Sequence, residues 1–118
     1  MLIFYRRWQS LSNDELIREL TEKITASIHP ESIILFGSMS REENNFDSDI
    51  DLLVIWNEEG TLSNRERRLK LRRLIGDFNK PLDLLTCTSV ELAKALAEPH
   101  SFTSQIVKEG RIIYGRLN

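Results

Sequence analysis

The sequence is poor in the residues that cross-link or interrupt a chain. Its 118 residues include one cysteine, three prolines and five glycines. A single thiol, Cys87, cannot form an internal disulfide, which excludes a disulfide-stabilised secreted scaffold. Cys87 also lies in an apolar stretch, where a free cysteine behaves as a small buried side chain. We therefore expect a reducing, cytoplasmic environment.

Long apolar runs and an excess of one charge are also missing. No run approaches the roughly 20 apolar residues that a membrane-spanning helix needs. The opening MLIFYRRW is too short for a secretory signal, and its charges follow the apolar residues instead of preceding them. The 16 basic and 18 acidic residues leave a net charge of −2, which gives no general attraction to nucleic acid or to anionic membranes. The sequence thus predicts no membrane contact, and direct nucleic-acid binding is not expected.

What remains is an ordinary globular composition, 41% hydrophobic and 29% charged. A chain of this length buries about two-thirds of its unfolded surface, which is enough for one core. Residues 1–118 are therefore expected to form a single domain.

Apolar patterns predict four helices and four strands. Ser12 and Glu15 have capping-box spacing, and apolar residues recur at helical spacing from Leu16 to Ile28, so a helix is expected over 13–28. Further helices are expected over 63–78, 88–97 and 99–110, the last beginning at Pro99. Strands are expected over 33–36, 49–56, 82–86 and 111–114. Short strands interleaved with helices predict an α/β or α+β sheet covered mainly by helices.

Two aspartates stand at the start of the second expected strand, DIDLLVIW. Asp49 and Asp51 project from one face, about 6.6 Å apart along the chain, because side chains alternate across a strand. Beyond them both faces are apolar, as in a central strand covered on each side. Ionised carboxylates at the edge of such a core cost about several kcal/mol each without a partner. A positively charged partner is therefore expected.

A divalent cation is the simplest such partner. Oxygen ligands on a rigid strand suit a hard cation such as Mg²⁺. Asp83, an acid between Leu82 and Leu84 in the third expected strand, offers a third carboxylate for a two-metal arrangement. The alternatives are a polar strand edge or a surface salt-bridge site for the first two aspartates and, for Asp83, a solvated position beside Lys80.

Gly37 and Ser38 directly follow the first expected strand. A glycine at this position lets the backbone turn sharply and approach a ligand closely. The serine can present its hydroxyl and amide to a phosphate. The pair is therefore a candidate phosphate-binding turn.

Taken together, these residues resemble the DNA polymerase beta-like nucleotidyltransferase superfamily. The pattern is Gly37-Ser38, ten intervening residues, Asp49-x-Asp51, and a later strand carrying Asp83. By its length the chain is similar to the minimal nucleotidyltransferases, or MNT proteins, of that superfamily. The resemblance implies the nucleotidyltransferase fold, a small mixed β-sheet of about four strands covered by helices.

The resemblance extends over roughly residues 11–115, but the loop after the first strand departs from it. Family members often read Gly-Ser-Arg-Ala-Arg-Gly at this place. The chain has Met39 in place of the first arginine and Glu42 in place of the final glycine, while Arg41 keeps the second arginine.

The resemblance also implies a role for each of these residues. Asp49, Asp51 and Asp83 would be the catalytic carboxylates that bind two Mg²⁺ ions. The nucleotide phosphates would be bound by three residues of the loop: Gly37, Ser38 and Arg41. An acceptor hydroxyl would attack the α-phosphorus of ATP in line, and pyrophosphate would leave as AMP is transferred. Asp83 would be best placed to help deprotonate the acceptor.

Many MNT proteins are antitoxins encoded beside a small helical HEPN protein, and some transfer AMP to a tyrosine of that toxin. The resemblance therefore implies a HEPN-type partner and an activity like that of a protein adenylyltransferase. Two alternatives remain open. The chain could be a non-catalytic antitoxin that neutralises a partner by forming a complex, as the changes at Met39 and Glu42 favour. It could instead be a catalytic subunit that modifies a small molecule such as an aminoglycoside. That activity would need a partner subunit or a homo-oligomer to build the substrate pocket.

The second expected helix carries six basic residues and one acid between Arg65 and Arg73. Such a run is more often a solvated helix face than a contact for RNA or an acidic partner. We expect the solvated face.

Overall fold

The computed structural model describes residues 12–37, 49–58, 61–78 and 80–117. Within these ranges the chain forms helices and strands in the predicted order. The helices are α2 (Asn13–Ser27), α3 (Asn64–Ile75), α4 (Ser89–Leu96) and α5 (Phe102–Glu109). The strands are β1 (Ser32–Phe36), β2 (Ile50–Ile55), β3 (Leu82–Cys87) and β4 (Arg111–Gly115).

The strands form one sheet in the order β3-β2-β1-β4. β1 pairs antiparallel with both β2 and β4, whereas β2 pairs parallel with β3. A parallel pair needs a long crossover connection, and α3 lies within it. The predicted small mixed sheet of about four strands covered by helices is confirmed.

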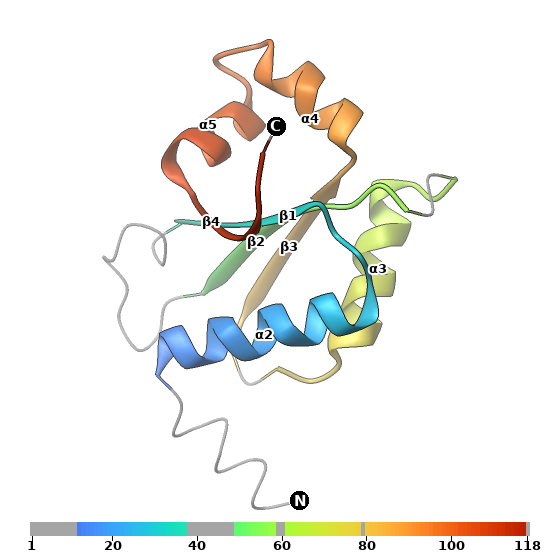
Figure 1. The fold of residues 1–118 in the computed structure, drawn as a ribbon, viewed down its shortest axis with the longest axis vertical. Helices are drawn as coiled ribbons and strands as arrows, with labels where there is room; N and C mark the ends of the chain where they lie inside the picture. Colours follow the sequence, from blue (N-terminus) through green and yellow to red (C-terminus); the bar gives the residue numbers. More distant parts are fainter. Residues whose placement is uncertain (1–11, 38–48, 59–60, 79, 118) are drawn as a thin grey trace, which may run out of the picture.

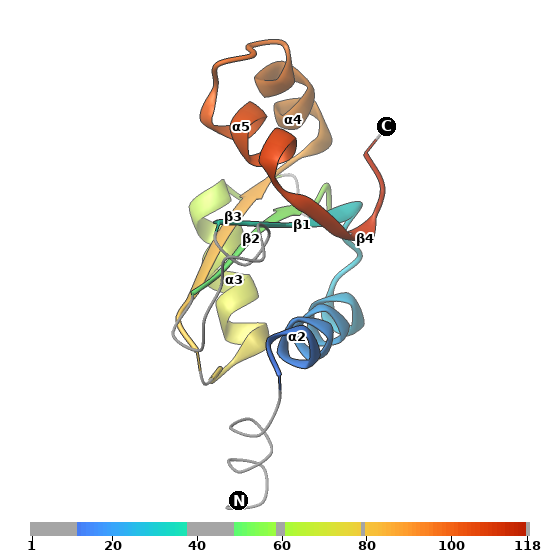
Figure 2. The same cartoon turned by 90° about the vertical axis from the view of Figure 1, so that its left-hand side faces the viewer.

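Helices cover both faces of the sheet. Helices α2 and α3 lie against one face, and α4 and α5 lie against the other (Figures 1 and 2). The larger core lies between the sheet and the first helix pair, where Leu20, Ile24, Leu71 and Ile75 are buried. A smaller core lies under α4 and α5. Cys87 packs against this smaller core, and burial raises the pKa of its thiol to about 11.

The central strand β2 has the two apolar faces that its sequence predicts. Leu52 and Val54 point into the larger core, and Leu53 and Ile55 point into the smaller one. Asp51 shares the face of Leu53 and Ile55 because side chains alternate along a strand. It therefore lies on the α4–α5 side of the sheet, at the beginning of β2.

Two predicted helix ends are wrong. The helix expected to reach residue 78 ends at Ile75, because Gly76 follows with a φ of 70°, which is outside the helical region. The helix expected to begin at Pro99 begins at Phe102. Ser101 is its N-cap: the hydroxyl of Ser101 accepts the backbone N–H of Ser104 at 3.1 Å.

The basic run on α3 is only in part the solvated face that was predicted. Arg65 and Arg73 are exposed, but Arg67 has only 1% of its surface exposed. The Nη1 group of Arg67 donates to the backbone carbonyl of Trp56 at 2.5 Å, and its guanidinium lies 5.9 Å from the centre of the Trp56 ring. Arg67 is therefore a core residue.

The buried side of α3 takes in only some of the apolar residues of the helix. Leu71 and Ile75 are buried, whereas Leu69 and Leu74 are exposed by 45% and 37%. Residues four positions apart share one side of a helix. Arg67, Leu71 and Ile75 follow that spacing, so the arginine takes the place of an apolar residue in the buried stripe.

Candidate active site

Asp51 and Asp83 lie side by side at the beginning of two parallel strands. They are register partners: Asp51 of β2 stands directly opposite Asp83 of β3. Adjacent strands are about 4.8 Å apart, so side chains on the same face meet. Asp83 shares the face of Leu85 and Cys87, which pack against the smaller core, and so projects to the same side as Asp51. The crossover through α3 thus brings two predicted site residues together.

The Asp51 carboxyl group has an altered acidity. Burial, a hydrogen bond with the Asp83 side chain, and repulsion from Asp83 and then Asp49 raise the pKa of Asp51 from 3.8 to about 6. A hydrogen bond between two carboxyl groups requires a proton on one of them. The pair therefore favours a state in which Asp51 keeps its proton, and the charge of Asp49 adds to this preference.

Gly37 closes one side of this site. It directly follows β1, whose last residue, Phe36, is the register partner of Asp51. Gly37 has a φ of 73°, which L side chains rarely adopt, and a Cβ atom there would overlap the Asp51 carboxylate. Only glycine meets both conditions without strain. The backbone after β1 therefore lies directly against the carboxylate of Asp51.

The site lies where the apolar cover of this face of the sheet ends. Leu53 and Ile55, farther along β2, are buried under α4 and α5. Asp51 is half-buried, while Asp49 and Asp83 are exposed. A ligand can therefore reach the carboxylates from solvent, while the sheet holds their backbones in place.

The donor set fits a hard cation, although the side chains do not form a ready-made cage. Among the described residues, no group of three or more His, Cys, Asp or Glu side chains is arranged to hold a metal ion. Asp51 and Asp83 instead share a hydrogen bond. Carboxylate oxygens are the ligands that Mg²⁺ prefers, and a positive charge would offset the repulsion that raises the pKa of Asp51.

The sequence predicted six site residues, and four of them lie in the described ranges. Gly37 lies against Asp51, Asp51 shares a hydrogen bond with Asp83, and Asp49 acts on Asp51 through its charge. Ser38 and Arg41 lie outside the described residues, as do the unusual loop positions Met39 and Glu42.

Sequence reasoning missed the direct pairing of Asp51 with Asp83. It identified both as acids in apolar strands, but strand order and register depend on packing between distant segments. The nearest signal is their common position, since each is the second residue of its strand. In a parallel pair this places them at the same edge of the sheet.

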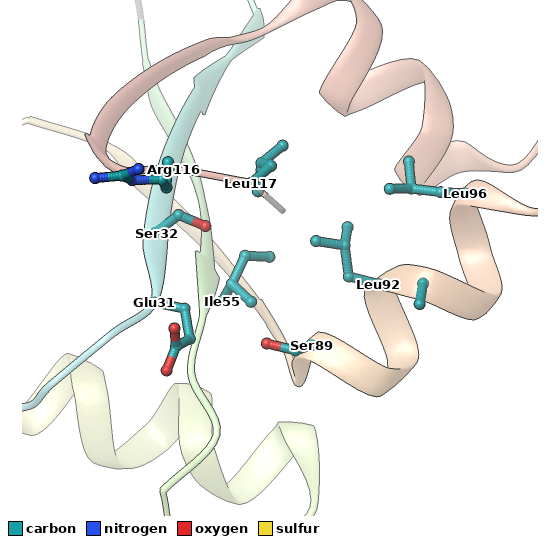
Figure 3. Close-up of a pocket in the computed structure, with 9 residues that line it drawn as sticks. Glu31, Ser32, Ile55, Ser89, Leu92, Leu96, Arg116 and Leu117 are labelled. Atoms are coloured by element: carbon teal, nitrogen blue, oxygen red, sulfur yellow. The ribbon is translucent and has the colours of Figure 1, made fainter.

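A separate cavity of about 190 Å³ lies at the opposite end of β1 and β2 (Figure 3). The start of β1, the end of β2, α4 and residues 116–117 enclose it, with apolar walls from Ile55, Leu92 and Leu96. No carboxylate of the candidate site lines it. This cavity is therefore not part of that site.

None of the helices in the described ranges is long and apolar enough to cross a membrane.

Known proteins with the same fold carry related descriptions. A solved structure from Sulfolobus solfataricus, assigned as a nucleotidyltransferase, is 22% identical with a TM-score of 0.60, covering 86% of this chain and 78% of that one. A toxin-antitoxin structure with AMP-PNP is 23% identical with a TM-score of 0.51, covering 89% of this chain and 75% of that one. At these identities the likeness concerns the fold. No curated protein matches the chain significantly.

The model of one protein family, described as "Polymerase beta, Nucleotidyltransferase", matches residues 15–117. The match takes in every described element except the first residues of α2. The chain belongs to the polymerase beta nucleotidyltransferase family.

Proposed function

We propose that the chain is a Mg²⁺-dependent nucleotidyltransferase that transfers AMP from ATP to a hydroxyl group. The observation that carries this proposal is the pairing of Asp51 with Asp83, directly against Gly37, at the open end of the sheet. Family membership supports the reaction class. Asp49 completes the set of three carboxylates that the sequence singles out.

Each residue has a task that follows from its position. Asp51, Asp83 and Asp49 would hold Mg²⁺, which would supply positive charge to offset that of the phosphates and of the reacting oxygens. Gly37 lets the backbone after β1 lie against the Asp51 carboxylate, which would bring a phosphate bound by this backbone close to the ion. Asp83 is exposed and can accept the proton of the incoming hydroxyl group. Rigid strands fix these groups, which favours an in-line attack on the α-phosphorus.

We further propose that the acceptor is a tyrosine of a small helical HEPN-type toxin and that the chain is its antitoxin. A domain of this size has little room for an acceptor pocket of its own, so a separate macromolecule suits it. The likeness to a toxin-antitoxin structure with AMP-PNP supports both the nucleotide and the partner. A cytoplasmic location is part of the same proposal.

Labelled ATP tests the reaction. The chain is incubated with Mg²⁺, ATP labelled in the α-phosphate, and the protein encoded by the adjacent reading frame. We expect the label on a tyrosine of that protein. Asp51→Asn and Asp83→Asn should each abolish transfer, while Asp77→Asn, which changes an exposed aspartate outside the site, should not. Transfer that continues unchanged in Asp49→Asn and Asp51→Asn would contradict the proposal.

A second candidate function is neutralisation of the partner by binding alone. The replacement of an arginine by Met39 and of a glycine by Glu42 favours it, because both changes fall in the phosphate-binding loop of the family pattern. Toxicity of the partner in cells separates the two functions. If Asp51→Asn still neutralises the toxin, binding is sufficient, and if it fails while the complex still forms, transfer is required.

A further inference from the structure

The exposed side of α3 gathers positive charge. Arg65, Arg72 and Arg73 are exposed. The single acid of this run, Glu66, is engaged at the start of the helix, where its carboxylate accepts the backbone N–H of Ser63 at 3.3 Å. The run from Arg65 to Arg73 holds six basic residues and one acid, whereas the whole chain has a net charge of −2. The rest of the chain is therefore net acidic, and α3 presents a surface of the opposite sign.

An exposed leucine stands among these arginines. Leu69 has 45% of its surface exposed. It follows Arg65 by four positions and precedes Arg72 and Arg73 by three and four, and residues at these spacings are neighbours on a helix surface. Arginine is enriched in protein interfaces, and the centre of such an interface is more apolar than its rim. The phosphates of a nucleic acid would leave the leucine without a contact, so the arrangement favours a protein partner.

The stability of the helix does not account for all of these charges. Arg72 and Arg73 lie in the last turn of α3, where a cation interacts favourably with the helix dipole. Arg65 is the second residue of the helix, where the same dipole makes a cation unfavourable. Within the described ranges, no hydrogen bond or ion pair engages the side chain of Arg65 or Arg73. Their charges are therefore available to a partner.

The same side of α3 adjoins the candidate active site. The helix packs along β3 (Figure 1). The Nη2 group of Arg72 donates to the backbone carbonyl of Leu82 at 2.9 Å, and Leu82 directly precedes Asp83. A protein bound to these arginines therefore lies beside the start of β3, at the end of the sheet where Asp51 and Asp83 meet.

We propose that this α3 surface, formed by Arg65, Leu69, Arg72 and Arg73, binds an acidic surface of the protein that accepts the nucleotide. The identity of the partner rests on the proposed function. Charge also orients the complex, because an acidic partner is attracted to α3 and repelled by the net acidic remainder of the chain. The complementary surface carries carboxylates around an apolar side chain that meets Leu69. Binding here holds the acceptor hydroxyl close to the carboxylates without a pocket of its own.

Calorimetric titration with the protein encoded by the adjacent reading frame, at low and high salt, tests the surface. Arg65→Glu should raise the dissociation constant about tenfold or more and reduce its salt dependence, since a like charge then faces the partner. Leu69→Gln should weaken binding at both salt concentrations. Both variants should fold, because an acid is favourable in the first turn of a helix and glutamine is a good helix former. Arg116→Glu is the matched control: Arg116 is exposed beyond β4, and its reversal should leave the dissociation constant within about twofold.

Binding and label transfer are measured separately, so the two proposals can fail independently. If the unsubstituted chain does not bind this protein, or if Arg65→Glu and Leu69→Gln bind it as tightly as the unsubstituted chain, the docking inference is overturned even where transfer is seen. If binding depends on Arg65 and Leu69 but no label is transferred, the surface stands and the transfer reaction fails. A single-stranded RNA oligonucleotide is titrated in parallel. RNA binding that Arg65→Glu abolishes, with partner binding unchanged, would assign the surface to nucleic acid and overturn the inference.

Discussion

The ionised carboxylate of Asp51 is unfavourable for the stability of the fold, yet the fold holds it in a fixed position. Its carboxyl group lies beside Asp83, under partial burial, and both effects raise its pKa to about 6. Because the folded pKa lies above the ordinary value of 3.8, folding favours the protonated form. The stability that comes from this preference is fully present below about pH 3.8 and is lost as the pH rises through 6.

This linkage gives a prediction for the metal-free protein. As the pH rises from 4 to 7.5, the free energy of unfolding of the unsubstituted chain should fall relative to that of Asp51→Asn, because the variant cannot ionise at this position. Urea unfolding at several pH values, with a chelator present, measures the difference. Asp77→Asn should follow the unsubstituted chain. A constant difference between Asp51→Asn and the unsubstituted chain across this range would contradict the assigned cause.

Gly37 gives a second prediction at the residue scale. Gly37→Ala puts a methyl group on the Asp51 carboxylate and a side chain at a positive φ, so we expect a loss of about 1–2 kcal/mol of stability from the backbone conformation alone. Nucleotide binding should weaken as well. Thermal unfolding and ATP titration measure the two effects. Gly76→Ala is the control, since it has a φ of 70° but its Cβ would meet only the end of the Lys23 side chain, at 3.9 Å. Equal ATP binding in both variants would argue against a role for Gly37 at the site.

The candidate site residues could be identified from the sequence because they violate the usual preferences of a β-strand. An aspartate inside an apolar strand and a glycine directly after one are unusual enough to be noticed without a structure. The hydrogen bond between Asp51 and Asp83 and the close approach of Gly37 to Asp51 could not be predicted. Both depend on which strands are neighbours and in which register, and packing between distant segments decides that.

Among the elements, α3 departs most from its sequence pattern. Its run of basic residues suggests a solvated surface, yet every fourth position from Arg67 faces the sheet. Arg67 can be buried there because the Trp56 carbonyl accepts its N–H group and the Trp56 ring lies under its guanidinium. The charge of Arg67 also contributes to lowering the pKa of Glu91, after the hydrogen bonds that Glu91 makes at Thr88 and Asn64. Sequence composition alone cannot identify which member of a basic run has such a partner.

The burial of Arg67 predicts a large effect from a mild substitution. Arg67→Met keeps an unbranched side chain but leaves the Trp56 carbonyl without its donor, which should reduce the free energy of unfolding by about 1–3 kcal/mol. Arg67→Lys should restore little, because an ammonium group lacks the planar fork of donors. Arg65→Met, at an exposed position of the same helix, should change stability by less than about 0.5 kcal/mol. Chemical unfolding of the three variants measures this, and similar losses for Arg67→Met and Arg65→Met would contradict the core assignment.

On the scale of the whole molecule, the sequence predicts the order of helices and strands well and the ends of the helices less well. The alternation of short apolar strands with helices places all eight described elements, because each pattern follows its own period of burial. The helix ends near Gly76 and Ser101 were missed because a glycine conformation and a local cap decide them. The order of the strands brings the site residues together. That order depends on the crossover from β2 through α3 to β3, which the pattern of no single segment reveals.

Cation binding should stabilise the whole fold through the candidate site. A ligand that binds only the folded state at a hundredfold excess over its Kd adds about 2.7 kcal/mol, so Mg²⁺ with ATP should raise the unfolding temperature of the unsubstituted chain. Asp51→Asn and Asp83→Asn should lose this increase, while Asp77→Asn keeps it. Differential scanning calorimetry with and without chelator makes the comparison. An unchanged increase in Asp51→Asn would place the cation elsewhere.

The parallel pairing of β2 with β3 also determines when the pair of carboxylates can form during synthesis. The ribosome releases β1, β2 and α3 before β3, so a nascent chain carries Asp49 and Asp51 well before it carries Asp83. The carboxylate pair exists only after β3 has crossed over and docked beside β2. A truncated or half-folded chain therefore lacks the carboxylate pair. Under the proposed function, such a chain should be inactive until β3 has folded.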